Sequence, residues 1–181
     1  NMQNLNGARL VCNQLGLEDS QFYQAIKTFK GASKRLQLIE SNDYTSIYID
    51  FAHSPSKLEA TVKAVKNQFP GRKLVACMEL HTYSSLNKHF LLNYRGTIDL
   101  ADIAIVYFNP ETLIHKRLAM ISEKEVIDAF RLKRLKVFTD PERLSEELIS
   151  INWRNKNLLL MSSGDFSGIN INVLAKKFVN Y

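Results

Sequence analysis

The hydrophobic positions of the first thirty residues recur at intervals of three and four, which is the spacing of one helix face. We expect one helix over residues 2–15, ended by Gly16, and a second that begins at Asp19 or Ser20 and ends before Gly31. The apolar faces of these two helices comprise Leu5, Ala8, Val11, Cys12 and Leu15, then Phe22, Ala25, Ile26 and Phe29. The chain therefore opens with two packed helices.

After Gly31 the hydrophobic period changes from helical spacing to two, the period of a half-buried strand. Two β-rich runs flank the turn-favouring residues 41–43, and the second run ends at Asp50. This change predicts a domain boundary, with residues 1–30 forming a helical tail and residues 31–181 forming the main domain.

Strand-like and helix-like segments alternate through the rest of the chain. Further strands are predicted over residues 73–80, 103–108, 136–138 and 157–161, and helices over residues 55–69, 85–94, 123–130, 141–151 and 171–178. Short strands alternating with helices are typical of right-handed crossovers in a parallel sheet. The predicted fold class is α/β: a Rossmann-like, doubly wound, mostly parallel sheet with helices on both faces, preceded by two helices.

The composition suits a folded protein of this class. A chain of 181 residues with 45% hydrophobic residues can bury one good core but not two full ones. The two cysteines, Cys12 and Cys77, lack the paired spacing of a metal site or disulfide framework, so we expect reduced, buried thiols and no metal site. No apolar stretch approaches the ~20 residues that span a bilayer. We therefore expect a cytoplasmic protein without a membrane partner.

The net charge of +6 favours polyanions in general, including nucleic acid, nucleotide phosphates and anionic metabolites. The densest basic segment, residues 131–136, alternates with leucine and has no aromatic residues on which bases could stack. We interpret it as a solvated connector and expect no nucleic-acid partner. A basic nucleic-acid binder remains the alternative, and it would show strongly salt-dependent affinity.

Candidate functional residues occur in two places: directly after the strand that ends at Asp50, and directly after Gly31, where the second helix stops. Asp50 and His53 lie between a strand end and the helix start at Pro55, where ligands of parallel sheets collect. Arg35 follows Gly31 and Lys34, and a guanidinium can hold phosphate oxygens through two hydrogen bonds. A turn cap at Asp50, a solvent-facing His53 and an ordinary surface Arg35 are the alternatives.

Three segments in order resemble the Mur ligase family: residues 1–4, residues 29–36 and residues 50–55. Members typically show His-Asn-x-x-Asn, a Gly-x-x-x-Arg-Arg-Phe-like junction and Asp-Tyr-Ala-His-x-Pro at matching intervals. The resemblance implies that residues 1–30 are the tail of a central ATPase domain and that residues 31–181 are the C-terminal domain. It also implies the following roles: adenine contacts for Asn1 and Asn4, a contact to the transferred phosphate for Arg35, and nucleotide contacts for Asp50 and His53.

Two later segments concern the amine substrate. Residues 78–85 keep the Glu of members that add a tripeptide, and the His and Tyr of members that add alanine, but lack the Arg of both. Residues 160–168 resemble the Ser-Gly or Asn-Gly loop of the tripeptide-adding members, which act in cell-wall recycling. The resemblance thus implies a substrate site containing His81, Ser84, Ser163 and Gly164.

The implied reaction is ATP-dependent amide formation on UDP-N-acetylmuramate through an acyl phosphate, with Mg²⁺ held mainly by the central domain. The expected donor is the tripeptide L-Ala-γ-D-Glu-meso-diaminopimelate, and L-alanine is the alternative. Because this chain has no Gly-Lys-Thr or Gly-Lys-Ser phosphate loop, we expect it to act with the N-terminal and central domains of the same protein. A non-catalytic α/β nucleotide-binding module, for example a receiver-like domain, is the remaining alternative.

Overall fold

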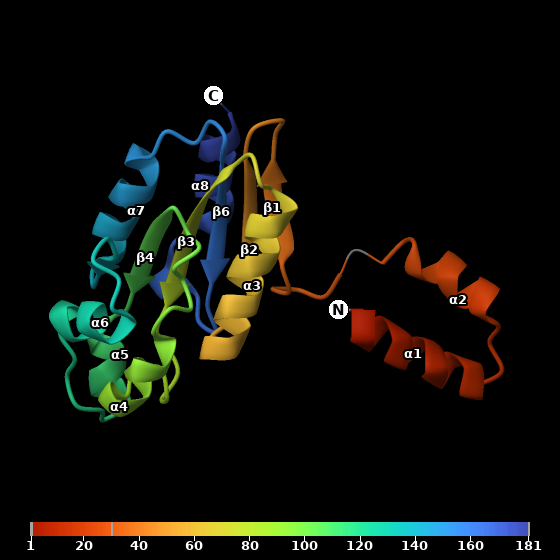
Figure 1. Ribbon diagram of the computed structural model, residues 1–181, viewed down its shortest axis with the longest axis horizontal. Helices are drawn as coiled ribbons and strands as arrows, with labels where there is room; N and C mark the ends of the chain where they lie inside the picture. The colour runs from red at the N-terminus through yellow and green to blue at the C-terminus, as the bar shows by residue number, and fades with distance from the viewer. Residues whose placement is uncertain (1, 30, 181) are drawn as a thin grey trace. The chain divides into compact units, whose positions relative to one another are not determined.

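The computed structural model describes residues 2–29 and 31–180 and divides into two compact units, Asn1–Ala32 and Ser33–Tyr181 (Figure 1). The two-helix beginning of the chain and the α/β class of the remainder are confirmed. The assignment of the first unit to the tail of a central domain stays a prediction.

The first unit consists of helices α1 (Met2–Gln14) and α2 (Asp19–Ile26). Glu18 rather than Asp19 or Ser20 caps α2, because Glu18 and Gln21 satisfy each other's backbone N–H groups. Phe29 lies beyond the end of α2 and is exposed, so its predicted place on the helix face is wrong. Cys12 is only partly buried, which corrects the expectation of a buried thiol there.

The second unit is built on a six-stranded sheet in the order β1-β2-β6-β3-β4-β5 (Figure 1). Its strands are β1 (Gln37–Ser41), β2 (Ser46–Asp50), β3 (Lys73–Glu79), β4 (Ile103–Tyr107), β5 (Lys136–Phe138) and β6 (Lys156–Met161). All neighbouring strands are parallel except β1, which pairs antiparallel with β2. The predicted mostly parallel sheet is therefore confirmed.

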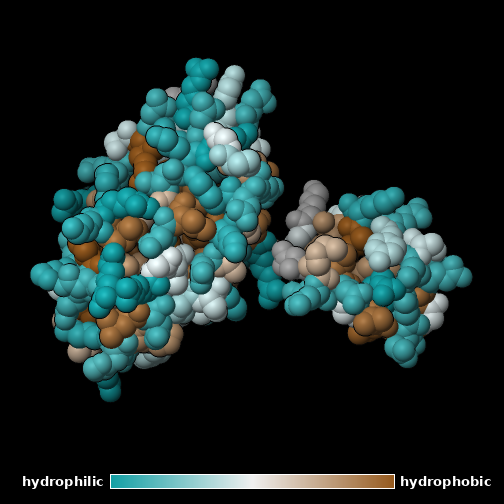
Figure 2. All heavy atoms as spheres, in the orientation of Figure 1, coloured by the Kyte–Doolittle hydropathy of each residue, from teal (hydrophilic) through white to brown (hydrophobic). Residues whose placement is uncertain are grey.

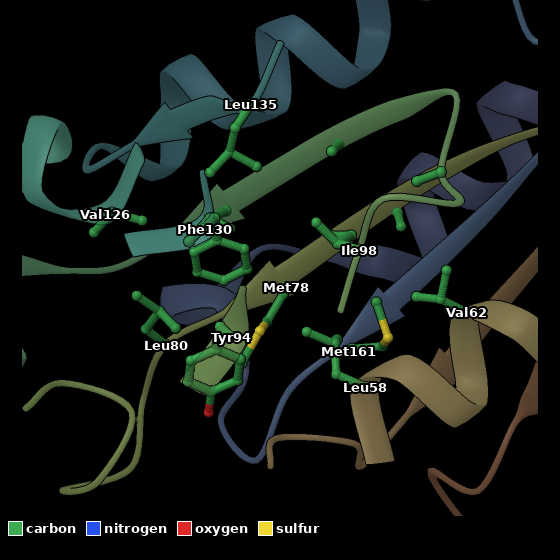
Figure 3. Close-up of a cluster of buried hydrophobic side chains, with 14 of the residues drawn as sticks. Leu58, Val62, Met78, Leu80, Tyr94, Ile98, Val126, Phe130, Leu135 and Met161 are labelled. Atoms are coloured by element: carbon green, nitrogen blue, oxygen red, sulfur yellow. The ribbon is translucent and has the colours of Figure 1, made fainter. Parts of the chain in front are cut away.

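Helices and two hydrophobic clusters cover the two faces of this sheet. The helices of the second unit are α3 (Pro55–Gln68), α4 (Lys88–Leu91), η1 (Leu92–Tyr94), α5 (Pro110–His115), α6 (Glu123–Phe130), α7 (Pro141–Ser150), η2 (Phe166–Gly168) and α8 (Ile171–Val179). One cluster contains apolar residues of α3, η1 and α6, including Leu58, Tyr94 and Phe130 (Figure 3). The other contains residues of α7 and α8, including Leu144 and Phe178. Apolar side chains thus fill both interfaces between sheet and helices.

Two helical segments differ from the prediction. The helix expected over residues 85–94 begins only at Lys88, because the Asn87 side chain accepts hydrogen bonds from the backbone N–H groups of His89 and Phe90. Helix α5 (Pro110–His115) was not predicted, although Asn109 and Pro110 form an ordinary helix start.

The carboxyl ends of three neighbouring strands form the edge that concerns function. Asp50 at the end of β2 is level with Met161 of β6, which is level in turn with Met78 of β3. Asp50, Glu79 and the loop after Met161 therefore lie next to one another at this edge of the sheet.

Figure 2 shows that polar residues dominate the visible surface. No helix in the described residues is long and apolar enough to cross a membrane.

Candidate functional site

Asp50 holds the segment that enters the domain. Its Oδ2 accepts a hydrogen bond from the backbone N–H of Leu36 (2.6 Å), and its Oδ1 accepts one from the N–H of Ala52 (2.7 Å). The N–H of Phe51 donates to the carbonyl of Lys34 (2.6 Å). The Asp50 carboxylate and the Phe51 N–H together fix the main chain on the two sides of Arg35, at Leu36 and at Lys34, to the end of β2.

The junction has a constrained backbone. Lys34 and Leu36 have φ of 51° and 48°, the left-handed region that side chains other than glycine rarely adopt. Leu36 packs against the hydrophobic cluster that includes α3, while the Lys34 ammonium donates to the carbonyl of Gly164 (3.0 Å). These contacts hold the junction against both the core and the loop after β6.

Arg35 is exposed between these two anchored neighbours. Within residues 2–29 and 31–180 its guanidinium has no hydrogen bond or ion pair, so its donors are available to an anion. Because Leu36 is bonded to Asp50, the structure brings the main chain of Arg35 next to Asp50, as expected for two residues of one site.

His53 is held by its own loop. Its Nδ1 lies 2.8 Å from the carbonyl oxygen of Phe51, and its ring meets the Phe51 ring edge-on with centroids 5.0 Å apart. The Tyr94 hydroxyl donates to the carbonyl of His53 (2.5 Å), and burial raises the pKa of this phenol, so it remains a donor. Phe51 is exposed and presents an aromatic face to solvent beside Asp50.

Glu79, at the end of β3, organises the loop after β6. Its side chain is buried, and Oε2 accepts hydrogen bonds from the Ser162 hydroxyl and from the backbone N–H of Phe166 (3.0 Å). Phe166 and Ser167 both have positive φ, so this loop is locally constrained. The sequence pattern of residues 78–85 included Glu79 but did not predict that its carboxylate would hold the loop after β6. A carboxylate that ends an apolar strand was the available signal.

Tyr107 of the neighbouring strand β4 and Cys77 of β3 itself lie near Glu79. The Tyr107 hydroxyl of β4 donates to the Ser167 hydroxyl (2.7 Å), and burial together with nearby carboxylates raises the pKa of this phenol despite that bond. Burial and the Glu79 charge also raise the pKa of the Cys77 thiol. Cys77 is therefore a protonated core residue, as its sequence context predicted.

The structure brings His81 and Gly164 together. His81 Nδ1 lies 3.7 Å from Glu79 Oε1, and a Cβ on Gly164 would lie 2.9 Å from the His81 ring. Only a glycine permits this approach of the loop to the ring. Ser163 is next to Gly164, and its hydroxyl is buried without a hydrogen-bond partner among the described residues.

Three further residues were predicted for the site: Ser84, Asn4 and Asn1. Ser84 is exposed and its hydroxyl is 3.1 Å from that of Thr82, beside an open pocket lined by Tyr83, Asn87 and Phe90 among others. Asn4 is an exposed residue of α1 in the other unit. Asn1 lies outside the described residues.

The groups at this edge of the sheet offer both hydrogen-bond donors and acceptors. The Arg35 guanidinium can donate to an anion, and Asp50 can accept further hydrogen bonds on its remaining lone pairs, while Phe51 beside them is exposed. No group of three or more possible metal ligands occurs within the described residues.

Comparison with known proteins places this geometry in a family. A curated relative, the UDP-N-acetylmuramate–L-alanine ligase of Agathobacter rectalis, is 28% identical over 97% of this chain. The chain covers only 38% of that protein and 23% of another relative from Sulfurihydrogenibium. It thus spans well under two-thirds of its relatives' length.

Solved structures show the same fold. The chain superposes on the UDP-N-acetylmuramate-alanine ligase MurC of Thermotoga maritima with a TM-score of 0.72 at 18% identity, covering 97% of this chain and 36% of that one. The murein peptide ligase of Psychrobacter arcticus gives 0.68 at 18%, covering 99% and 37%. The MurF ligase of Thermotoga maritima, solved in complex with ADP, gives 0.58 at 18%, covering 93% and 35%.

A family model described as the glutamate ligase domain of Mur ligases matches residues 34–164, from the junction to the loop that contacts Glu79. This match includes Arg35, Asp50, His53 and the contact between His81 and Gly164. The chain therefore belongs to the Mur ligase family.

Proposed function

We propose that this chain is the C-terminal part of an ATP-dependent ligase that forms an amide bond on the carboxylate of UDP-N-acetylmuramate. The observation that carries the proposal is the junction, where Asp50 holds the backbone around an exposed Arg35 at the carboxyl edge of the sheet. In the proposed reaction ATP phosphorylates the carboxylate, and an amine then displaces phosphate. Arg35 stabilises the phosphoryl group, while the remaining domains of the protein hold most of the ATP and Mg²⁺.

The proposed donor is the tripeptide L-Ala-γ-D-Glu-meso-diaminopimelate, and the proposed setting is cell-wall recycling in the cytoplasm. Support comes from the Glu79 carboxylate and the Ser163–Gly164 loop, which resemble the tripeptide-adding members, and from the similarity to a murein peptide ligase. L-alanine is the second candidate donor, because the curated relatives are alanine ligases and residues 81–83 keep the His and Tyr of that group.

The test uses the full-length protein with UDP-N-acetylmuramate, ATP, Mg²⁺ and either donor. We expect phosphate release and an amide product with the tripeptide. Arg35→Ala should lower kcat about 100-fold or more, because a cation at the transferred phosphate contributes that much. Arg143→Ala, which removes an exposed guanidinium on α7, is the matched control and should keep full activity.

Each outcome has a definite meaning. If product forms with L-alanine but not with the tripeptide, L-alanine is the donor. Turnover of neither donor would overturn the ligase assignment, and an unchanged kcat in Arg35→Ala would remove Arg35 from the site.

A further inference from the structure

One oxygen of the buried Glu79 carboxylate has no hydrogen-bond donor within the described residues. The residue is 2% exposed, and the two bonds that it accepts, from Ser162 and Phe166, both go to Oε2. Burial of a carboxylate is unfavourable unless its oxygens are paired. Ser163 Oγ, not Oε1, is the fully buried unpaired side-chain atom among the described residues, so Oε1 keeps contact with solvent and can accept a hydrogen bond from a group outside the loop.

His81 is the residue that faces this oxygen. Its Nδ1 lies 3.7 Å from Oε1, longer than a hydrogen bond, and its side chain is 36% exposed. The absent side chain of Gly164 leaves room for the Nδ1 edge of the ring to lie inward. Nε2 is the ring nitrogen that does not face Glu79, and the side chain is partly exposed.

The charges around this pair come from four segments. Glu79 is on β3, the Lys34 ammonium approaches from the junction and bonds the Gly164 carbonyl, and Asp165 belongs to the loop after β6. The Tyr107 phenol of β4 lies close enough for Glu79 and Asp165 to raise its pKa.

We propose that His81 is the general base of the amide-forming step and that Glu79 is the residue that positions it; this inference rests on the proposed function. The incoming donor is an ammonium ion and cannot attack while protonated. Nε2 of His81 takes one proton, which leaves the free amine. The nitrogen then bonds to the acyl-phosphate carbon, and the tetrahedral intermediate breaks its bond to the phosphate oxygen. The departing phosphate takes the second proton of the amine, and the imidazolium releases its proton to solvent.

Glu79 contributes by fixing the ring. When the donor closes the site, Oε1 accepts a hydrogen bond from Nδ1–H, which holds the tautomer whose Nε2 can receive a proton. The same carboxylate stabilises the imidazolium that forms. Its other oxygen holds the loop through Ser162 and Phe166, so the ring and the loop share one anchor.

The test separates acyl-phosphate formation from amine attack in the full-length protein. Hydroxylamine, which is uncharged at pH 7, traps an acyl phosphate as a hydroxamate without needing a base. We expect His81→Gln to keep hydroxamate formation while lowering kcat for amide formation about 100-fold to 10,000-fold, the usual contribution of a general base. His115→Gln, a change at an exposed histidine of α5, is the matched control and should alter neither rate.

The pH profile provides a second readout. Amide formation by His81→Gln should recover at alkaline pH, where the donor loses its proton to solvent. Glu79→Gln should show the same separation of the two rates with a smaller loss in kcat, and its loop should stay folded because the amide oxygen can still accept from Ser162 and Phe166.

The inference fails if His81→Gln lowers hydroxamate and amide formation equally, which would indicate a binding or structural role, or if it lowers neither. It also fails if alkaline pH does not restore the variant. If the unmodified protein forms neither hydroxamate nor amide, the proposed ligase function itself is wrong. That result is distinct from the three outcomes above, which concern the His81→Gln variant.

Discussion

Gly164 shows how one missing side chain shapes the site. A Cβ at this position would lie 2.7 Å from Glu79 Oε2 and 2.9 Å from Cγ and Nδ1 of His81, closer than real contacts allow. The buried carboxylate cannot move away without losing its bonds to Ser162 and Phe166. We therefore expect Gly164→Ala to lower the free energy of unfolding by about 1–3 kcal/mol, the usual cost of overpacking.

Urea unfolding of the 181-residue chain followed by far-UV circular dichroism measures this effect. Gly71→Ala is the matched control, because a Cβ there meets nothing within 4 Å. It should change the free energy of unfolding by no more than about 0.5 kcal/mol. Equal stability of the two variants would show that the loop can relax around the added methyl group.

Part of this site could be predicted from single residues. Asp50 and His53 were predicted as candidates because ligands of parallel sheets collect at strand ends, and Arg35 because a guanidinium can hold phosphate oxygens. The close approach of His81 to Gly164 could not be predicted, since it depends on how the ends of β3 and β6 come level across the sheet. The hydrogen bond from Lys34 to Gly164 joins residues 130 positions apart, and no local pattern signals such a contact.

At the scale of elements, α4 and α6 are joined by a charged contact. The Lys88 ammonium of α4 lies 2.7 Å from the Glu125 carboxylate of α6, which also accepts bonds from the backbone N–H and hydroxyl of Ser122. These hydrogen bonds lower the pKa of Glu125 to about 2. The bond from Lys88 has the largest effect, and the two bonds from Ser122 add to it. The folded protein therefore favours the ionised form of Glu125.

This depressed pKa predicts how stability depends on pH. The stabilisation is fully present above the unfolded pKa of glutamate, about 4.3, and is lost as the pH falls towards about 2. Glu125→Gln should therefore make the acid loss of stability shallower between pH 4.3 and pH 2. Urea unfolding at several pH values measures it, with Glu59→Gln on the exposed side of α3 as control. If the free energy of unfolding falls equally steeply with decreasing pH in the unmodified protein and in Glu125→Gln, the lowered pKa of Glu125 does not contribute to stability.

Elements were predictable where a hydrophobic pattern had enough length. The helix predicted over residues 55–69 is present as α3, and its buried residues Leu58, Val62 and Val65 recur at the spacing of one helix face. The short α4 and α5 were harder to predict, because four to six residues carry too little periodicity and their starts depend on the side chains of Asn87 and Asn109.

At the scale of the whole molecule, the two units differ in how much core they contain. Both hydrophobic clusters draw their members from residues after Ser33. In the first unit α1 has no buried residue, and α2 has one, Phe22. Because apolar burial is the main stabilising contribution to folding, the second unit should account for nearly all the stability of this chain.

Residues 33–181 should therefore fold without residues 1–32. We expect the shorter chain to keep the midpoint of urea unfolding of the 181-residue chain, because neither cluster loses a member. In the longer chain, amides of α1 should exchange with solvent much faster than those of β3, since helices of this length need packing to persist. A clear fall in the midpoint after truncation, or slow exchange in α1, would show that the helical unit is stabilised by contacts beyond its own few buried atoms. That result would also mean that the first unit does not need a further domain to fold.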